Sequence, residues 1–339
     1  MQNRMAFFSM LDNEQEPGFE ARVRRLRFRI DGFLYSTRLS YYIQLSFSRG
    51  DLDAADGVTP NIIRDAMVYY TFTKNFYIGF GQSKLPGNRQ RVVSSGNLQM
   101  PERSIANQLF NIDRDYGLFA YHTIPLGTPI IKVKTAVTSG EGRNAVFSNI
   151  GLAYTGRLEF LPFGKFANNG DYSEGDLEYE EHFKASFAGT YSYNHKAVRS
   201  GGQLGFSLDM PVDIQSIIFD LMLKYRGWAL MGEYFNKSLL NTSSESTRLA
   251  SIYYGQGYNV QLSKTFKNHF ELGLRYAGAL SQNPNLSDFS TSGVNIGKYL
   301  NGHRIKIQGF LGLDNRSQSA QNFRLNNRFA AMMQVEFGI

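Results

Sequence analysis

The sequence contains no cysteine and a single tryptophan among its 339 residues. Without cysteine the chain can form neither a disulfide framework nor a thiolate metal site. Its mean hydropathy is −0.32, and no stretch approaches the roughly 18 consecutive apolar residues that a membrane-spanning helix needs. These absences exclude a small disulfide-stapled domain and a helical membrane protein.

Aromatic residues and glycine are plentiful, with 27 Phe, 20 Tyr and 33 Gly. Strands favour Phe and Tyr, and the two interfaces of a membrane barrel absorb many of them. The formal charge is +7. Because Lys and Arg are spread along the chain, nucleic-acid binding is disfavoured. The basic excess then belongs either to an ordinary solvated surface or to the inside of a pore.

Apolar and polar residues alternate strictly over long segments. In 25–31, Leu26, Phe28 and Ile30 share one side, whereas Arg25, Arg27, Arg29 and Asp31 share the other. A period of two is the signature of a β-strand. The same pattern recurs at 38–49, 183–194, 269–276, 303–314 and 324–339.

These strands are about 10–15 residues long, whereas strands of soluble sheets average about 5–6. We place them near 19–31, 38–49, 62–73, 76–84, 113–123, 130–139, 147–161, 183–194, 214–226, 228–238, 250–266, 269–281, 292–300, 303–314 and 325–339. Bacterial barrels have even strand numbers, and residues 4–11 supply a further strand. The sequence therefore predicts an all-β, antiparallel, up-and-down transmembrane β-barrel of sixteen strands, with fourteen or eighteen as alternatives, forming one domain over 1–339.

Short and long links alternate along the chain, as they do when short turns are periplasmic and long loops extracellular. Tight links fall at 32–37, 74–75, 124–129, 267–268 and 301–302; longer polar links fall at 50–61, 85–112, 195–213, 239–249, 282–291 and 314–323. The 21-residue link 162–182 breaks the rule. Either it is a genuine periplasmic excursion or the strand register fails there.

The water-facing sides of the strands carry a set of basic residues that can attract anions into a pore. These are Arg25, Arg27, Arg29, Lys132, Lys134, Lys224, Arg275, Arg304, Lys306 and Arg328. The same sides also carry Asp31, Asp65, Asp220, Glu271 and Glu336. The alternative is therefore that the arginines pair with neighbouring carboxylates and only hold the wall together.

The longest loop, 85–112, contains Arg89, Arg91, Glu102 and Arg103, and its MPERSIANQLF stretch favours a short helix. These residues either line a constriction or hold an ordered loop through Glu–Arg pairs. The acidic run 171–181 has oxygen ligands that suit calcium, but its spacing fits no known calcium loop. We interpret it as a solvated loop and expect no metal or other cofactor.

Catalysis has little support in the sequence. The five histidines, His122, His182, His195, His269 and His303, fit no zinc-binding spacing or triad signature. We therefore expect no enzyme activity.

Several motifs of the first two hundred residues occur in the order found in a known family. They are RVRRLRFRIDG at 22–32, the run Arg64, Asp65 and Ala66, IGFGQSKLP at 78–86, PERSIAN at 101–107, and Arg114, Asp115, Tyr116 and Gly117. Weaker matches follow at 156–164, 170–181 and 191–194. The chain thereby resembles the phosphate-selective porins of O and P type from Gram-negative outer membranes. The resemblance implies a sixteen-stranded barrel, commonly trimeric, narrowed by an inward-folded loop, here 85–112.

The resemblance also implies a location and partners: the cell outer membrane with its lipid and lipopolysaccharide, small anionic solutes, and either a homotrimer or other outer-membrane proteins, but no nucleic acid. The first residues, MQNRMAFFSML, do not read as a signal peptide, so we expect that peptide to have been removed or left out of this sequence. The leading hypothesis is passive diffusion of small hydrophilic solutes with a moderate preference for anions such as phosphate. The alternative is a porin-like barrel serving as a structural or accessory subunit of a larger outer-membrane complex.

Overall fold

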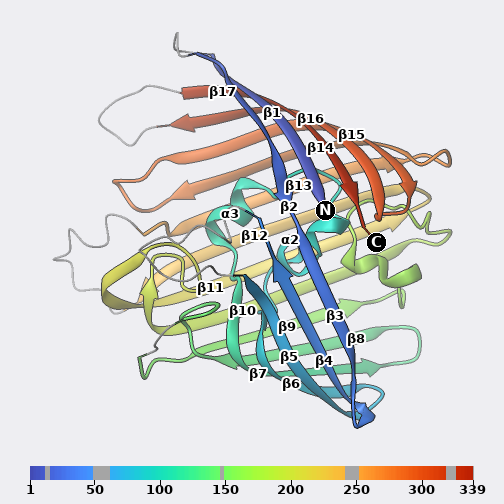
Figure 1. Cartoon of the computed structure of the whole chain (residues 1–339), viewed down its shortest axis with the longest axis vertical. Coiled ribbons are helices and arrows are strands. Elements are labelled where there is room, and N and C mark those ends of the chain that lie inside the picture. The colour runs from blue at the N-terminus through green and yellow to red at the C-terminus, as the bar shows by residue number, and fades with distance from the viewer. Residues whose placement is uncertain (12–15, 49–61, 146–148, 241–251, 318–325, 339) are drawn as a thin grey trace.

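In the computed structural model, the strands of the chain form the wall of a barrel with short helices inside it (Figure 1). The structure describes residues 1–11, 16–48, 62–145, 149–240, 252–317 and 326–338. The two ends of the chain meet in the wall, where the amino group of Met1 donates a hydrogen bond of 2.6 Å to the carbonyl of Phe337. None of the helices in these ranges is long and apolar enough to cross a bilayer.

The wall strands have the following bounds. The first nine are β1 Gln2–Met10, β2 Gly18–Arg25, β3 Arg27–Leu34, β4 Ser36–Ser46, β5 Ile63–Thr73, β6 Phe76–Lys84, β7 Arg114–Pro125, β8 Ile130–Thr138 and β9 Ala153–Leu161. The others are β10 Lys184–Arg199, β11 Ser207–Tyr225, β12 Trp228–Leu240, β13 Gly255–Thr265, β14 Phe270–Ser281, β15 Asp288–Asn301, β16 Ile305–Ser317 and β17 Asn326–Phe337. The helical turns are α2 Arg89–Val92, η2 Ser95–Asn97, α3 Ile105–Phe110 and η3 Ala167–Tyr172.

Every pairing between strands is antiparallel, and the pairings follow the chain around the barrel. The ring closes because β1 pairs with β17 on one side and with β2 on the other. The predicted all-β, antiparallel, up-and-down barrel is confirmed.

Seventeen strands are described where the sequence predicts sixteen, and the difference arises at Leu26. This residue alone separates β2 from β3, so the two are parts of one passage of the chain across the wall. The passage changes partners there: β2 pairs with β1, whereas β3 pairs with β4. A register shift against Gln2 and Asn3 inserts Arg24 as an extra residue, and such a bulge bends a strand and re-aims its side chains. Both Arg24 and Arg25 consequently point into the barrel and contact Glu102.

The alternation of the strands is inverted relative to a soluble protein, with polar residues inside and apolar residues outside. Along β14, Leu272, Leu274 and Tyr276 are more than half exposed, whereas Glu271 is fully buried and Arg275 is 6% exposed. Outward apolar bands of this kind face lipid in membrane barrels. The tightly filled part of the molecule is therefore its polar interior.

The ends of several strands differ from those predicted. β10 and β11 extend into the predicted loop 195–213 and leave only residues 200–206 between them, while β9 begins at Ala153, six residues later than predicted. The long strands continue because backbone pairing between them persists beyond the alternating segment. The predicted loop 50–61 and most of 239–249 and 314–323 lie outside the described residues.

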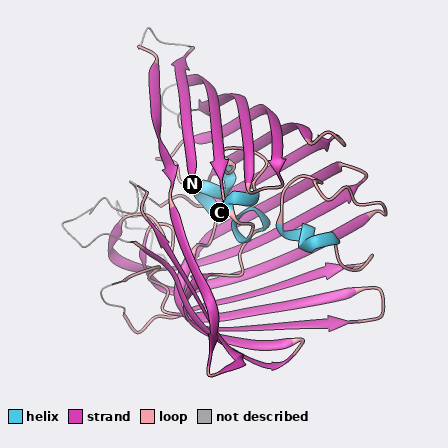
Figure 2. Ribbon diagram, turned by 45° about the vertical axis from the view of Figure 1, so that its right-hand side comes forward, coloured by secondary structure: helices cyan, strands magenta, loops and turns pink. Residues whose placement is uncertain are grey.

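Two segments fold into the lumen, and Figure 2 shows their helices inside the ring of strands and near its mouth. The first is the predicted inward loop between β6 and β7. The second is 162–183, which joins β9 to β10 at the end of the barrel that carries the tight turns, so the predicted register holds. The interpretation of 171–181 as a solvated loop is wrong for four of its carboxylates. Asp171, Glu174, Asp176 and Glu180 are buried because the segment turns inward and bonds to the wall and to the first loop.

Candidate pore lining and constriction loop

The loop between β6 and β7 contains the helix predicted from MPERSIANQLF. Helix α3 begins after Ser104, whose hydroxyl accepts a hydrogen bond of 3.1 Å from the backbone N–H of Asn107. A serine N-cap of this kind satisfies one of the free amides of the first turn. At the other end, Phe110 packs against Phe235 and Tyr253, with ring centroids 6.1 and 5.4 Å apart. Helix α3 is thus fixed to β12 and to the inner wall.

Wall side chains hold the middle of the loop by its backbone. The ammonium of Lys306 donates to the carbonyls of Gly96 and Leu98 at 2.7 and 2.5 Å. Gln308, two residues further along β16, donates to the carbonyls of Leu98 and Gln99 at 3.1 and 2.7 Å. These contacts satisfy carbonyl groups that would otherwise be buried without partners.

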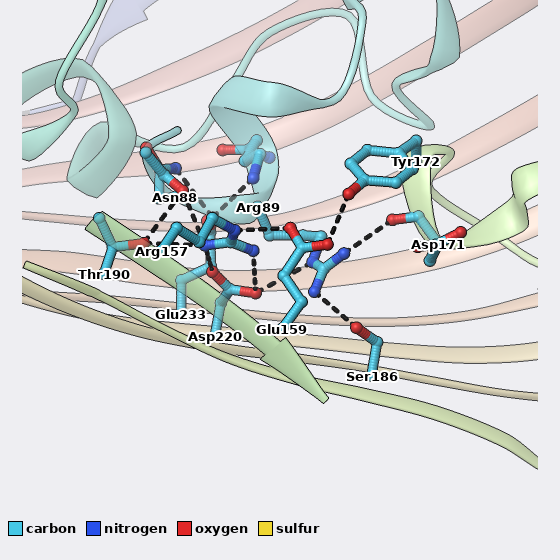
Figure 3. Close-up of polar contacts among 12 residues, drawn as sticks. Asn88, Arg89, Arg157, Glu159, Asp171, Tyr172, Ser186, Thr190, Asp220 and Glu233 are labelled. Atoms are coloured by element: carbon cyan, nitrogen blue, oxygen red, sulfur yellow. Dashed lines mark hydrogen bonds and ion pairs between the residues drawn. The ribbon is translucent and has the colours of Figure 1, made fainter. Parts of the chain in front are cut away.

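A buried network of ion pairs holds the start of the loop (Figure 3). Asp220 of β11 accepts hydrogen bonds from Arg89 of the loop at 2.9 Å and from Arg157 of β9 at 2.6 and 2.9 Å. Arg157 also donates to Glu159 at 2.6 Å and to the carbonyl of Gly87 at 2.7 Å. All four charged side chains are fully buried. The network links two strands to the loop, and each of its four charged side chains has a partner of opposite charge.

Glu102 lies between arginines of the first two strands. It forms ion pairs with Arg4 of β1 and with Arg24 and Arg25 of β2. Burial alone would raise the pKa of this carboxyl, but Arg25, Arg24 and Arg4 together lower it to about 2. The loop is therefore anchored by one ionised carboxylate at the seam where the barrel closes.

The lowered pKa of Glu102 predicts a pH window for this anchor. Because the folded-state pKa of about 2 lies below that of an unfolded Glu, the stabilisation is fully present above about pH 4.5 and is lost as pH falls through 2. The difference in heat stability between the native protein and Glu102→Gln should be large at pH 7 and shrink toward zero near pH 2. Heat-induced mobility shifts in gels at a series of pH values measure it. A difference independent of pH would contradict the prediction.

A second group of basic residues collects where the loop approaches β2, β3, β5, β6 and β7. It consists of Arg25, Arg27, Arg64, Lys84, Arg91, Arg103 and Arg114, which lie within electrostatic reach of one another; we refer to these seven residues as the basic cluster. In the described part of the chain, three carboxylates are paired directly with it: Asp65 with Arg114, Asp113 with Arg91 and Arg114, and Glu102 with Arg25. Arg27, Lys84 and Arg103 bond instead to neutral oxygens of the loop, so these three members of the basic cluster keep their positive charge without a directly paired carboxylate in the described residues.

Electrostatic repulsion within the basic cluster is visible in its loop members. Burial, followed by repulsion from Arg25, lowers the pKa of Arg103 to about 9. Burial and repulsion from Arg103 and Arg114 likewise lower the pKa of Arg91 well below its ordinary value. An anion entering the basic cluster would relieve this repulsion.

The lysines predicted from strands β8 and β11 face the lumen and contact the second inward segment. Lys132 forms an ion pair of 2.6 Å with Asp171 of the segment. Lys134 pairs with Glu159 of β9 at 3.0 Å and also donates to the hydroxyl of Tyr172 in the segment. Lys224 donates to the carbonyl of Ser173 at 3.1 Å. These side chains fasten the segment to the wall in addition to contributing positive charge.

The other predicted basic residues have separate surroundings. Arg27 donates to the hydroxyl of Ser95 in the loop at 2.6 Å, and Arg275 donates to the carbonyl of Glu102 at 2.7 Å. Arg29 pairs with Asp31, and Arg328 pairs with Asp314; both arginines are exposed. Arg304 lies exposed in the turn before β16 and not on a strand.

The sequence analysis did not single out Lys84, Arg114, Arg157 or Asp220 as a connected set. Arg157 and Glu159 alternate with Leu158 and Phe160, so their inward direction was visible in the sequence. Their partner Asp220 was recognised only as a carboxylate that faces inward. The signal that was missing is the direct contact of Arg157 on β9 with Asp220 on β11, two strands separated by β10, which no local pattern contains.

One hollow lies on the outer surface of the barrel wall. It has a volume of about 1110 Å³ and is lined by apolar side chains of β1 and β13 to β17, among them Leu274, Ile296 and Met333. Its outward side chains belong to the apolar band, so it suits lipid and not a hydrophilic solute.

Comparison with protein families gives a match over residues 3–198, more than half of the chain, to the family described as phosphate-selective porin O and P. The chain belongs to this family. It is therefore an outer-membrane porin, as the ordered motifs of its first two hundred residues predict. The fold and the family are those of a channel. A comparison with curated protein sequences found no significant match.

Solved structures with the same fold are distant in sequence. The anion-selective porin from Comamonas acidovorans is 11% identical, with a TM-score of 0.58, and the match covers 98% of this chain and 97% of that one. The outer membrane channel DcaP of Acinetobacter baumannii is 13% identical, with a TM-score of 0.56 and coverage of 99% and 95%. Pseudomonas putida OprB is 7% identical, with a TM-score of 0.57 and coverage of 98% and 92%. At these identities the likeness shows the fold alone.

Proposed function

We propose that this porin admits small hydrophilic solutes with a moderate preference for anions such as phosphate. The observation that carries the proposal is the basic cluster beside the inward loop. In it, Arg27, Lys84 and Arg103 bond to loop oxygens and form no direct ion pair with a carboxylate in the described residues. Low-dielectric walls focus such a field and raise the local concentration of anions. Membership of a family described as phosphate-selective supports the same solute class.

The loop 85–112 is proposed to form the constriction, with Arg91, Arg103 and Glu102 at its pore side and Arg89 as an internal anchor. Among the proposed pore-lining residues of the wall, Arg25 and Arg27 belong to the basic cluster, while Arg29 is nearer the end with tight turns. Carboxylates bonded to the lysines of β8 weaken the field there. This balance of charge is the reason for proposing a moderate preference and not strict phosphate specificity.

Removing two charges from the basic cluster should weaken the preference for anions. Arg27 and Lys84 suit the purpose because each bonds to loop oxygens, and neither forms a direct ion pair with a carboxylate in the described residues. The double variant Arg27→Gln, Lys84→Gln should lower the chloride-to-potassium permeability ratio by roughly threefold, since rings of basic residues set anion selection. Reversal potentials in a KCl gradient across a planar bilayer measure the ratio.

Lys298→Gln serves as the matched control. Lys298 donates to the carbonyl of Asn268 near a tight turn and lies over the exposed ring of Phe270 on the outer side of the wall. The loss of one positive charge there should leave the permeability ratio unchanged. Cation selectivity of the native protein would refute the proposed preference. Absence of conductance, together with a stoichiometric protein partner, would favour the accessory-subunit alternative.

We propose a homotrimer as the assembly in the membrane. The fold is shared with OmpT of Vibrio cholerae, whose structure is described as a trimer form and is 9% identical, with a TM-score of 0.50 and coverage of 98% and 96%. The size of the complex extracted in mild detergent tests this proposal.

A further inference from the structure

A separate cavity opens at the end of the barrel that carries the tight turns. Its volume is about 430 Å³, and it lies between the wall strands β6 to β8 and the second inward segment. That volume is within the range of small-molecule pockets. Because short turns are periplasmic in membrane barrels, the cavity belongs to the periplasmic mouth and is distinct from the basic cluster.

Four lysines line this cavity: Lys74, Lys132, Lys134 and Lys165. The lining includes one carboxylate, Asp171, which is paired with Lys132, while Glu159 pairs with Lys134. In the described residues, Lys74 and Lys165 form no ion pair, and both are exposed. Two uncompensated ammonium groups therefore stand at the rim of the cavity.

Three tyrosines complete the lining. Tyr77 and Tyr121 lie almost parallel, with an interplanar angle of 14° and ring centroids 4.6 Å apart. Tyr172 stands opposite on the inward segment, where its hydroxyl donates to Glu159 and its ring lies 4.5 Å from the ammonium of Lys134 (Figure 3 shows Tyr172 and Glu159). Tyr69 extends the aromatic surface, 6.0 Å from Tyr77.

The cavity combines lysines with an aromatic surface, and an inorganic anion would make no use of the aromatic part. A small inorganic anion gains from the ammonium groups alone, whereas a ring gains by stacking on an aromatic face. The stacked pair of Tyr77 and Tyr121 supplies such a surface beside free lysines. The cavity therefore matches a solute that has a charged group at one end and a flat ring at the other.

We propose that this cavity is a binding site for small anions that carry a ring, such as aromatic phosphates, with Lys74 and Lys165 holding the charged group and Tyr77 and Tyr121 the ring. The site rests on the pore function because its ligand would reach it through the lumen. It goes beyond a general preference for anions by naming a class of solute that binds more tightly than inorganic phosphate.

Block of single-channel current by phenyl phosphate, compared with inorganic phosphate, tests the proposal. The native protein should show a lower half-blocking concentration for phenyl phosphate. Tyr77→Leu, Tyr121→Leu together should raise that concentration about tenfold and leave block by inorganic phosphate unchanged. Lys74→Gln, Lys165→Gln should weaken block by both anions.

The control variant Lys267→Gln, Lys298→Gln removes two lysines from the same end of the barrel. Lys267 lies in another tight turn, and Lys298 bonds to that turn. Both half-blocking concentrations should stay unchanged in this variant. Equal block of the native protein by both anions would overturn the proposed site. A Tyr77→Leu, Tyr121→Leu variant that keeps the native ratio of the two half-blocking concentrations would overturn it as well. The KCl reversal potential is measured on the same channels, so a lost site with retained anion selectivity is distinguishable from failure of the proposed selectivity.

Discussion

Replacing Arg157 with Met should destabilise the barrel by about 3 kcal/mol. Arg157 is fully buried and donates to Asp220, to Glu159 and to the carbonyl of Gly87. Methionine fills much of the same volume but leaves two buried carboxylates without their shared partner. Because Asp220 keeps Arg89 and Glu159 keeps Lys134, the loss should fall at the lower end of the range for a broken buried pair. The temperature at which the folded gel band disappears measures the change.

Arg328→Met is the matched control for this substitution. Arg328 pairs with Asp314 at 2.6 Å, but it is 45% exposed. Exposed pairs of this kind contribute little, typically below about 1 kcal/mol. Equal losses of heat stability in the two variants would show that burial does not decide the strength of these pairs.

Replacing Phe110 with Ala should release the inward loop and enlarge the pore. Phe110 is almost fully buried in a cluster with Ala106, Ile218 and Phe235, and truncation of such a side chain typically costs about 3–5 kcal/mol. The wall strands keep their backbone pairing, so the loss should fall mainly on the attachment of α3. Single-channel conductance and open-channel noise should both rise, and proteases should cut the loop faster.

Phe80→Ala provides the comparison for the loop variant. Phe80 is exposed on the outer side of β6, where its ring packs against Tyr116. The truncation there removes the same atoms without touching the loop, so conductance should stay at the native value. Native conductance in the Phe110 variant would mean that the remaining polar contacts of Lys306 and Gln308 suffice to hold the loop in place.

The wall of the barrel could be derived from the sequence because each strand carries its own alternation. Leu26, Phe28 and Ile30 face outward, and all three are exposed apolar residues. In a membrane, a strand with an Arg between two apolar residues must turn the Arg toward the lumen and the apolar residues toward lipid. The local pattern therefore decides which side of the wall each residue faces. The count of strands differed because the bulge at Arg24 and the change of partner at Leu26 depend on neighbouring strands.

The interior could not be derived in the same way. Arg89 and Asp220 are 131 positions apart in the chain and meet only because the loop lies against β11. The carboxylates of 171–181 looked solvated because the sequence shows their charge but not the lysine, glutamine and backbone N–H groups that bind them in the fold. Alternation in the sequence predicts which side chains face the lumen. Which of these side chains bond to each other, and which stay available to a solute, depends on contacts between segments far apart in the chain.

The loop between β6 and β7 has a further role that follows from where its anchors lie. Through Glu102 it contacts Arg4 of the first strand and Arg25 of the second, and through Leu98 it contacts Lys306 of the next-to-last strand. This loop, from the first third of the chain, thus contacts strands on both sides of the junction between β1 and β17 at which the barrel closes. The two ends of the sheet are therefore held together by side-chain contacts with this loop as well as by the backbone pairing of β1 with β17.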